Sequence, residues 1–244
     1  MDKSQYIGIT ETSDPSFHLE LFDNLYEGNI IITKRLTDKL NEKLIDNKEK
    51  CILHFTVTGL GGSKVEPFVP TVEQSYKKFC QLIDGGFPIE QVVLRIDPII
   101  PTDKGIETAL SVVETFKDCG IKRVRFSVLD MYKHVKERFE ENGFPIPYHT
   151  FHAPLSVRKG IADKLSELGE KYGFEVEACG EPGIESVSCL SQKDIDILGL
   201  TDKIKLEGNK EQRETCNCPA NKHQLIKAKP SRCQNNCVYC YWKS

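Results

Sequence analysis

Three cysteines near the end of the chain have the spacing of an iron–sulfur ligand loop. Cys233, Cys237 and Cys240 are spaced C-x3-C-x2-C, and Tyr239 directly precedes the last of them. Three thiolates on one tight loop can hold three irons of a cubane cluster and leave the fourth iron open to chelate a small molecule. The alternatives are free thiols or a structural zinc ion, but zinc sites favour C-x2-C pairs and four ligands. The spacing therefore favours a 4Fe-4S cluster with an open coordination position.

A second set of four cysteines could also bind a metal. Cys179 and Cys189 flank the end of the last predicted strand, and Cys216 and Cys218 form a C-x-C pair in the tail. Four thiols are a complete ligand set for one zinc ion or for a second iron–sulfur cluster, and the spacing leaves that choice open. Alternatively, Cys179 and Cys189 are only core thiols, because free cysteine is among the most buried residue types. The other three cysteines are expected in the core: Cys51, Cys80 and Cys119.

The elements that must position these thiols alternate between short strands and helices. Apolar periodicity predicts six strands, over residues 6–10, 29–33, 51–58, 92–97, 123–129 and 174–179. Helical periods fill most of the gaps, and this alternation means parallel strands joined by right-handed crossovers. We therefore predict an α/β fold, specifically a partial or closed TIM-like (β/α) barrel of about six parallel strands with a cysteine-rich C-terminal tail.

Start and stop signals delimit four of the helices. Asp14 and Pro15 predict the beginning of the first, which would end before Gly28. Apolar stripes predict three more helices, over 72–83, 106–113 and 157–172, each followed by glycine.

The predicted strands carry polar side chains on one face, which is unusual for buried parallel strands. The alternating polar residues are His54, Thr56, Thr58, Arg95, Asp97, Arg125, Ser127, Glu177 and Cys179. A charged barrel interior is costly unless the charges pair or a ligand fills the space. A closed ion network of Arg95, Asp97, Arg125 and Glu177 is the alternative. The additional hydroxyl and imidazole groups favour a polar cavity instead.

Sites in such barrels lie at the carboxyl ends of the strands. The residues expected there are Thr10, Thr33, Lys34, Thr58, Arg95, Asp97, Ser127, Asp130 and Glu181. Pro98 should end its strand and so present Arg95 and Asp97 at the barrel mouth, unless the two form a salt bridge that only fixes the loop. Gly61 and Gly62 follow a strand and could let the backbone approach a cofactor, although glycine-rich turns are also ordinary loop chemistry.

Length and composition favour one structural unit. The 244 residues contain no linker-like run, so we assign residues 1–200 to the barrel and 201–244 to a cluster-binding segment packed on its mouth. No apolar run has membrane-spanning length and the first residues lack a signal-peptide profile, so a cytoplasmic protein with reduced thiols is expected. The net charge of −3 argues against phosphate-backbone binding over the whole surface.

Several common enzyme classes lack their motifs in this chain. The glycine-rich turn has no P-loop lysine and hydroxyl, which disfavours nucleoside triphosphate chemistry. The six histidines show no two-ligand spacing, and no nucleophile elbow is present, so a zinc hydrolase and a serine hydrolase are both disfavoured.

The string from Arg232 to Tyr241 resembles the cluster loop of radical S-adenosylmethionine (SAM) enzymes, especially the spore photoproduct lyase group. In those enzymes the loop follows the first barrel strand. A loop at the extreme C-terminus is similar instead to a bacterial and phage family of unknown function, number 1848, whose members also carry a Gln-Arg…Cys-x-Cys stretch, here residues 212–218. The similarity includes Thr33-Lys34-Arg35, Arg95-Ile96-Asp97-Pro98, Ala178-Cys179-Gly180-Glu181 and Ser188-Cys189. It departs at residues 10–15, where Thr-Glu-Thr-Ser-Asp-Pro replaces a basic motif.

The resemblance implies a circularly permuted radical SAM barrel. The open iron would chelate SAM, and one electron from an external donor would cleave its C–S bond to give a 5′-deoxyadenosyl radical. The residues it implies are Arg95, Asp97 and Ser127 for catalysis, and Tyr239, Gly61, Gly62, Thr58, Lys34 and Glu181 for the cofactor, with Tyr239 against the adenine. The implied substrate is a nucleobase, a nucleotide or a nucleic acid undergoing repair or modification.

A different class of function is also compatible with the sequence. The chain could be a non-catalytic, metal-stabilised barrel that binds a partner protein or a nucleic acid. Only four residues follow Cys240, so the helix that usually buttresses such a loop would have to come from the N-terminus.

Overall fold

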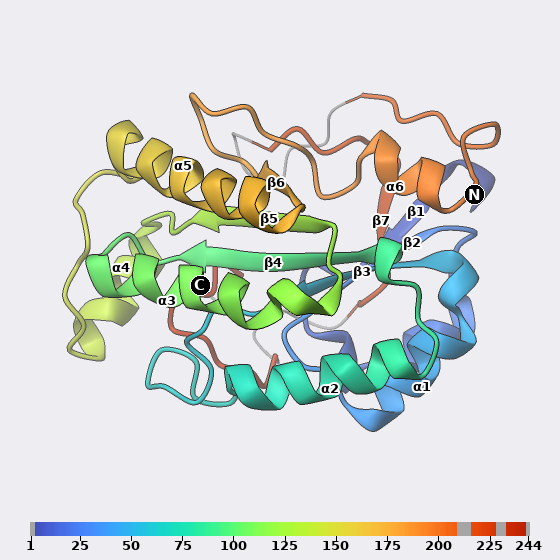
Figure 1. Cartoon of the computed structure of the whole chain (residues 1–244), viewed down its shortest axis with the longest axis horizontal. Coiled ribbons are helices and arrows are strands. Elements are labelled where there is room, and N and C mark those ends of the chain that lie inside the picture. Colours follow the sequence, from blue (N-terminus) through green and yellow to red (C-terminus); the bar gives the residue numbers. More distant parts are fainter. Residues whose placement is uncertain (1–2, 209–215, 228–232, 243–244) are drawn as a thin grey trace.

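A single sheet of seven parallel strands forms the centre of the molecule (Figure 1). The computed structural model describes residues 3–208, 216–227 and 233–242. The strands are β1 (Ile7–Ile9), β2 (Asn29–Thr33), β3 (Cys51–Thr56), β4 (Val92–Ile99), β5 (Arg123–Val128), β6 (Glu175–Ala178) and β7 (Lys222–Gln224). Their order is β6-β5-β4-β3-β2-β1-β7, so the first six lie side by side in chain order. This arrangement confirms the predicted α/β fold with parallel strands.

Six α-helices accompany the described strands. They are α1 (Asp38–Asp46), α2 (Val72–Asp84), α3 (Asp103–Phe116), α4 (Lys133–Glu141), α5 (Leu155–Tyr172) and α6 (Gln192–Ile197). Local signals set their ends: Thr71 and Gln74 form a capping box at the start of α2, and Gly173 closes α5 in a left-handed conformation. Because successive strands add in one direction with right-handed crossovers, the connecting helices α1, α2, α3 and α5 cover one face of the sheet.

The first predicted helix is wrong. Two 3-10 segments, Pro15–Phe17 and Leu19–Asn24, take its place. Asp14 caps the first of them by accepting a hydrogen bond from the Ser16 backbone N–H, as an N-cap residue should. The same carboxylate also accepts bonds from the end of β2, which ties the chain to the sheet before a regular α-helix can develop.

The two faces of the sheet bury different side chains. On the helix side, Phe55 of β3 stacks on Phe79 of α2 with ring centroids 5.9 Å apart, and Phe116 of α3 packs against both rings. On the opposite face, near the amino ends of the strands, a smaller cluster contains Ile52 and Val93 together with several cysteines. Toward the carboxyl ends of the strands, this second face carries the alternating polar side chains that the sequence predicted.

The charged residues of that face separate into two groups. One is a buried network in which Glu177 accepts from Arg125 (2.6 Å) and Arg123 (3.2 Å), while Asp194 accepts from Arg123 at 2.7 Å. These charges pair with one another, as the alternative interpretation of the sequence predicted for Arg125 and Glu177, and Arg125 Nη1 alone of their side-chain nitrogen and oxygen atoms has no partner among the described residues. Arg95 pairs with Asp97 separately, at the cavity described below.

Two differences from the predicted strands bear on the site. β4 does not end at Asp97 but continues through Pro98 to Ile99, because its pairing register with β5 shifts between Ile96 and Ile99 and the proline lies within that irregularity. β7 has no apolar alternation and was not predicted. It comes from the predicted 201–244 segment, and its pairing with β1 places part of that segment in the main sheet.

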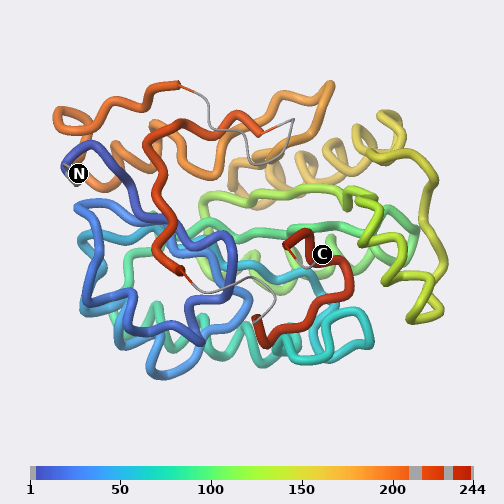
Figure 2. The backbone as a smooth tube through the Cα atoms, turned by 180° about the vertical axis from the view of Figure 1, so that it is seen from behind, coloured from blue at the N-terminus to red at the C-terminus, as the bar shows by residue number. Residues whose placement is uncertain are grey.

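Seen from behind, the two ends of the chain lie well apart, the N-terminus at the edge of the molecule and the C-terminus near its middle (Figure 2). There the C-terminal residues run beside the N-terminal segment that follows β1. Among the described residues, no helix has both the length and the apolar composition needed to cross a bilayer.

We expect Glu177→Gln to lower the free energy of unfolding by about 3–5 kcal/mol, because it leaves two buried guanidinium groups without their shared carboxylate. Glu175→Gln is the matched control on the same strand: its exposed pair with Lys193 should contribute less than about 1 kcal/mol. Urea unfolding of both variants measures the difference. Equal losses in the two variants would contradict the structural role assigned to the network.

Candidate functional site

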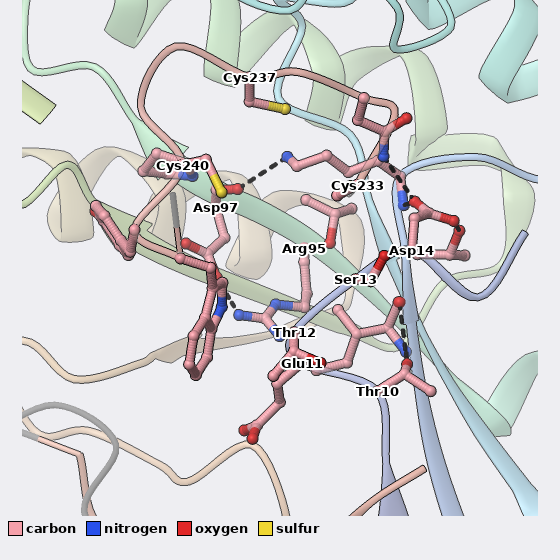
Figure 3. Close-up of a pocket in the computed structure, with 18 of the residues that line it drawn as sticks. Thr10, Glu11, Thr12, Ser13, Asp14, Arg95, Asp97, Cys233, Cys237 and Cys240 are labelled. Carbon is pink, nitrogen blue, oxygen red and sulfur yellow. Dashed lines mark hydrogen bonds and ion pairs between the residues drawn. The ribbon is translucent and has the colours of Figure 1, made fainter. Parts of the chain in front are cut away.

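A cavity of about 350 Å³ opens at the carboxyl ends of β1 to β4 (Figure 3). Three groups of residues form most of its wall: residues 10–14 after β1, the ends of β2, β3 and β4, and the tail residues 233–242. Its size lies within the range of small-molecule sites, and its position is the one expected for ligands in parallel α/β folds.

The tail brings its three closely spaced cysteines to this cavity. Cys233, Cys237 and Cys240 all line it, and Figure 3 shows Cys237 and Cys240 above Arg95. Cys237 is buried, whereas the other two are half-buried. Burial raises the pKa of Cys237 to about 12, and the nearby Lys34 ammonium opposes that rise. The three predicted cluster ligands therefore share one cavity.

A buried carboxylate, Glu66, anchors the cysteine loop. It accepts hydrogen bonds from the Tyr239 hydroxyl and from Thr58 Oγ1 (2.5 Å), and Lys34 Nζ lies 3.0 Å from its Oε1. Burial lowers the pKa of Lys34, but Glu66 and the Cys237 thiol raise it by more, so the ammonium stays charged. Backbone pairing adds to the anchor, since the Val238 N–H donates to the Val65 carbonyl at 2.9 Å.

A second carboxylate fixes the other side of the loop. Asp14 accepts from Asn235 Nδ2 at 2.9 Å, from Thr33 Oγ1 at 2.8 Å and from the Lys34 backbone N–H at 2.8 Å. One aspartate thus joins the N-terminal segment, the end of β2 and the cysteine loop. Asn235 lies inside the C-x3-C-x2-C motif, so this bond fixes the motif itself.

Arg95 and Asp97 form an ion pair in the wall of the cavity. Ser127 Oγ donates to Asp97, and Lys34 Nζ donates to the Asp97 carbonyl at 3.2 Å. Some buried polar atoms in and below the wall have no partner among the described residues: Arg95 Nε, Asn235 Oδ1 and both ring nitrogens of His54. Burial, together with Arg125 and Arg95, lowers the pKa of His54 far below its usual value, so its ring is neutral. The cavity therefore retains unused hydrogen-bonding capacity.

The second cysteine set converges below the same cavity. Cys179 Sγ lies 3.7 Å from Cys189 Sγ, and Cys216 Sγ lies 3.0 Å from Cys218 Sγ. Cys189 and Cys218, with Glu11, place ligand atoms within 4.8 Å of one another. All four thiols are buried, and Cys189 also lines the cavity. Burial and the neighbouring Cys189 raise the pKa of Glu11 to about 7. Of these residues, Glu11, Cys189 and Cys218 form a possible metal-binding group, and Cys179 and Cys216 each lie beside one of its thiols.

The remaining predicted site residues lie behind the cavity wall. Thr58 donates a hydrogen bond to Glu66, and Ser127 donates one to Asp97, so both support residues of the site from behind. Glu181 accepts from the Val128 backbone N–H at 2.7 Å and pairs with Arg158. Gly61 packs on its own loop, since a Cβ there would lie 1.9 Å from the Pro70 carbonyl oxygen, and the φ of +76° at Gly62 suits the turn. In the family-like stretch, Gln212 and Arg213 lie outside the described residues, as does Arg232.

Sequence reasoning missed several residues of this site. Glu66 is an isolated acid in a loop, and no pattern marks it. Glu11 and Asp14 lie in residues 10–15, where the sequence differs from the family motif. That difference was the one sequence feature that could have pointed to them as cavity residues. The aromatic residues at the rim were also missed: Tyr132 lies 5.1 Å from Tyr241 between ring centroids, and both line the cavity with Trp242.

Comparison with known proteins identifies the family. The model of a domain of unknown function, DUF1848, matches residues 18–242, and the chain belongs to that family. No curated protein matches the chain significantly.

We expect Glu66→Gln to loosen the cysteine loop, because three donors lose their charged acceptor. Loss of one charged hydrogen bond, worth about 1.5–3 kcal/mol, should raise the alkylation rate of Cys237 by iodoacetamide about tenfold or more in metal-free protein. Peptide mass spectrometry measures the rate, with fully buried Cys51 as the internal control for global unfolding. Glu73→Gln, an exposed change on α2, should leave Cys237 unreactive. An unchanged Cys237 rate in the Glu66 variant would contradict the anchoring role.

Proposed function

We propose that this member of the DUF1848 family is a radical SAM-type enzyme whose C-terminal cysteines hold a 4Fe-4S cluster. The observation that carries the proposal is the convergence of Cys233, Cys237 and Cys240 on one cavity at the carboxyl ends of the strands. In this reading the sequentially ordered open sheet is a partial (β/α) barrel, with the cluster loop at its mouth.

The residues around the cavity are suited to an iron–sulfur cluster and a polar cofactor. The three thiols supply soft ligands for three irons and leave one coordination position open. Two cations lie nearby: Lys34, beside Cys237, and Arg138, which donates to the Cys240 carbonyl. They would offset the negative charge of thiolate ligands. Arg95 Nε and Asn235 Oδ1 offer a buried donor and a buried acceptor with no protein partner among the described residues.

When reduced, the bound cluster would supply one electron to split the C–S bond of SAM. The chain's own residues would bind and orient the cofactor and the substrate. Asp97 presents a carboxylate that Arg95 and Ser127 hold in place, and it can accept hydrogen bonds from an amine or from ribose hydroxyls. Tyr239 serves first as an anchor for the loop through Glu66, and its ring lies 5.3 Å from Lys34 Nζ.

The rim of the cavity is suited to a planar substrate. Tyr132, Tyr241 and Trp242 offer aromatic faces there, and 41% of Trp242 is exposed. Aromatic rings of this kind stack on nucleobases with little regard to sequence. A nucleobase, a nucleotide or a nucleic acid is therefore the proposed substrate class, and an external protein or small-molecule reductant is the proposed electron donor.

Protein purified without oxygen should be brown, with a broad visible absorbance that dithionite bleaches, because thiolate-bound cubanes have strong charge-transfer bands. Replacing Cys233, Cys237 and Cys240 together by alanine should remove about four irons per chain. Iron analysis and visible spectroscopy test both points. A colourless wild-type protein that takes up only zinc after anaerobic reconstitution would overturn the cluster assignment.

Reduced, cluster-loaded protein supplied with SAM should release 5′-deoxyadenosine slowly even without substrate. Asp97→Asn should lower the rate by about tenfold or more at a temperature where the variant is still folded, because removing the charged partner of buried Arg95 also lowers stability. Asp103→Asn, an exposed change at the start of α3, is the matched control. Chromatography of the products measures the rate.

The outcomes separate the enzyme from the non-catalytic alternative. If the cluster-loaded wild-type protein makes no deoxyadenosine with any reductant, the enzyme proposal fails and a metal-stabilised binding protein is favoured. If the wild-type protein makes it and the Asp97 variant matches the wild type, the chemistry stands but the role of Asp97 does not.

A further inference from the structure

We propose that Cys179, Cys189, Cys216 and Cys218 bind one zinc ion at the floor of the cavity, as a site separate from the three-cysteine loop. This inference goes beyond the proposed function and does not depend on it. The four residues reach one place from two distant parts of the chain: the loop after β6 carries the first two, and the tail before β7 carries the others.

The distances between sulfur atoms favour a single ion. Tetrahedral zinc with Zn–S bonds of about 2.3 Å places its sulfurs about 3.8 Å apart. The Cys179 and Cys189 sulfurs are 3.7 Å apart, and the ligand atoms of Cys189 and Cys218 lie within 4.8 Å. The Cys216 and Cys218 sulfurs, at 3.0 Å, are closer than tetrahedral zinc allows, so one of these two side chains would have to turn when the ion binds. Thiolates on different irons of a cubane lie farther apart, so this group is too compact for a second cluster.

The surroundings are matched to the charge of a tetrathiolate site. Four thiolates and one Zn²⁺ carry a net charge of −2, which is costly to bury unless cations lie nearby. Arg95 Nη1 lies 3.9 Å from Cys189 Sγ, and Lys222, which pairs with Glu11 at 3.0 Å, lies near Cys189 and Cys218. N–H groups directed at ligand sulfurs are the outer contacts that orient metal ligands and tune the site.

Glu11 is assigned to these outer contacts rather than to the ion. Its oxygens accept from Lys222 Nζ at 3.0 Å and from Gln224 Nε2 at 3.1 Å. A closed set of four thiolates is typical of structural zinc. The ion would tie the loop after β6 to the tail beside the short edge strand β7. Through the contact between Cys189 and Arg95, it would also fix one wall of the cavity.

The test uses the chain in which Cys233, Cys237 and Cys240 are replaced by alanine, so that any metal belongs to the second site. After reconstitution and gel filtration in a weak chelator, elemental analysis should find about one zinc per chain. Cobalt should replace it and give the intense red-region bands of tetrahedral cobalt thiolate. Adding Cys216→Ser and Cys218→Ser should lower the zinc content at least about fivefold, whereas adding Cys80→Ser and Cys119→Ser should not.

Each result decides the assignment. If the protein binds no zinc and shows no cobalt–thiolate spectrum, the zinc assignment is wrong. If it retains about four irons with sulfide, the four cysteines bind an iron–sulfur cluster instead of a single ion. If the variant with Cys216→Ser and Cys218→Ser fails to fold, the cobalt spectrum of the triple-alanine protein still reports how many thiolates bind the ion. Fewer than four thiolates would contradict the assignment of all four cysteines as ligands. Glu11→Gln should keep its zinc, and loss of zinc would make Glu11 a ligand. The protein used in this test has alanine in place of Cys233, Cys237 and Cys240. A negative result for zinc therefore does not bear on the proposed enzyme function.

Discussion

Two buried carboxylates, Glu66 and Asp14, hold the cysteine loop against the ends of the strands, and the site depends on that attachment. The loop packs Cys237, Val238 and Tyr239 into the apolar core, and the two carboxylates fix its position against the strand ends. Glu66 joins it to the Thr58 loop and to Lys34, while Asp14 joins it to β2 through Asn235. Each carboxylate is buried, and each is saturated by hydrogen bonds or an ammonium ion, which is the condition under which buried charge is tolerated.

The polar face of the sheet serves two purposes at different depths. Arg123, Arg125 and Glu177, with Asp194, pair with one another and stabilise the side of the sheet toward β6. Nearer the cavity, Arg95 has contacts in two directions, to Asp97 at the wall and to Cys189 below it. Arg95 therefore links Cys189 to the wall of the cavity that the three-cysteine loop also lines.

Much of this arrangement could be predicted from the sequence. Alternation within β3, β4 and β5 identified the polar face, and strand ends identified Arg95 and Asp97, because period-2 patterning is a local property. Glu66 and β7 could not be found in this way, since their roles come from contacts distant in sequence. Asp14 was recognised as a helix cap, but its bonds to Thr33 and Asn235 decide its position. Pro98 lies within a register shift between two strands, and that shift has no signal in either strand alone.

Electron paramagnetic resonance of the reduced protein, recorded before and after addition of SAM, tests most directly whether the cavity holds a cluster with an open iron. We expect the signal of a reduced 4Fe-4S cluster whose g-values shift when SAM binds, because the cofactor would enter the coordination sphere. A cluster signal that SAM leaves unchanged, or no signal in iron-loaded protein, would contradict the account.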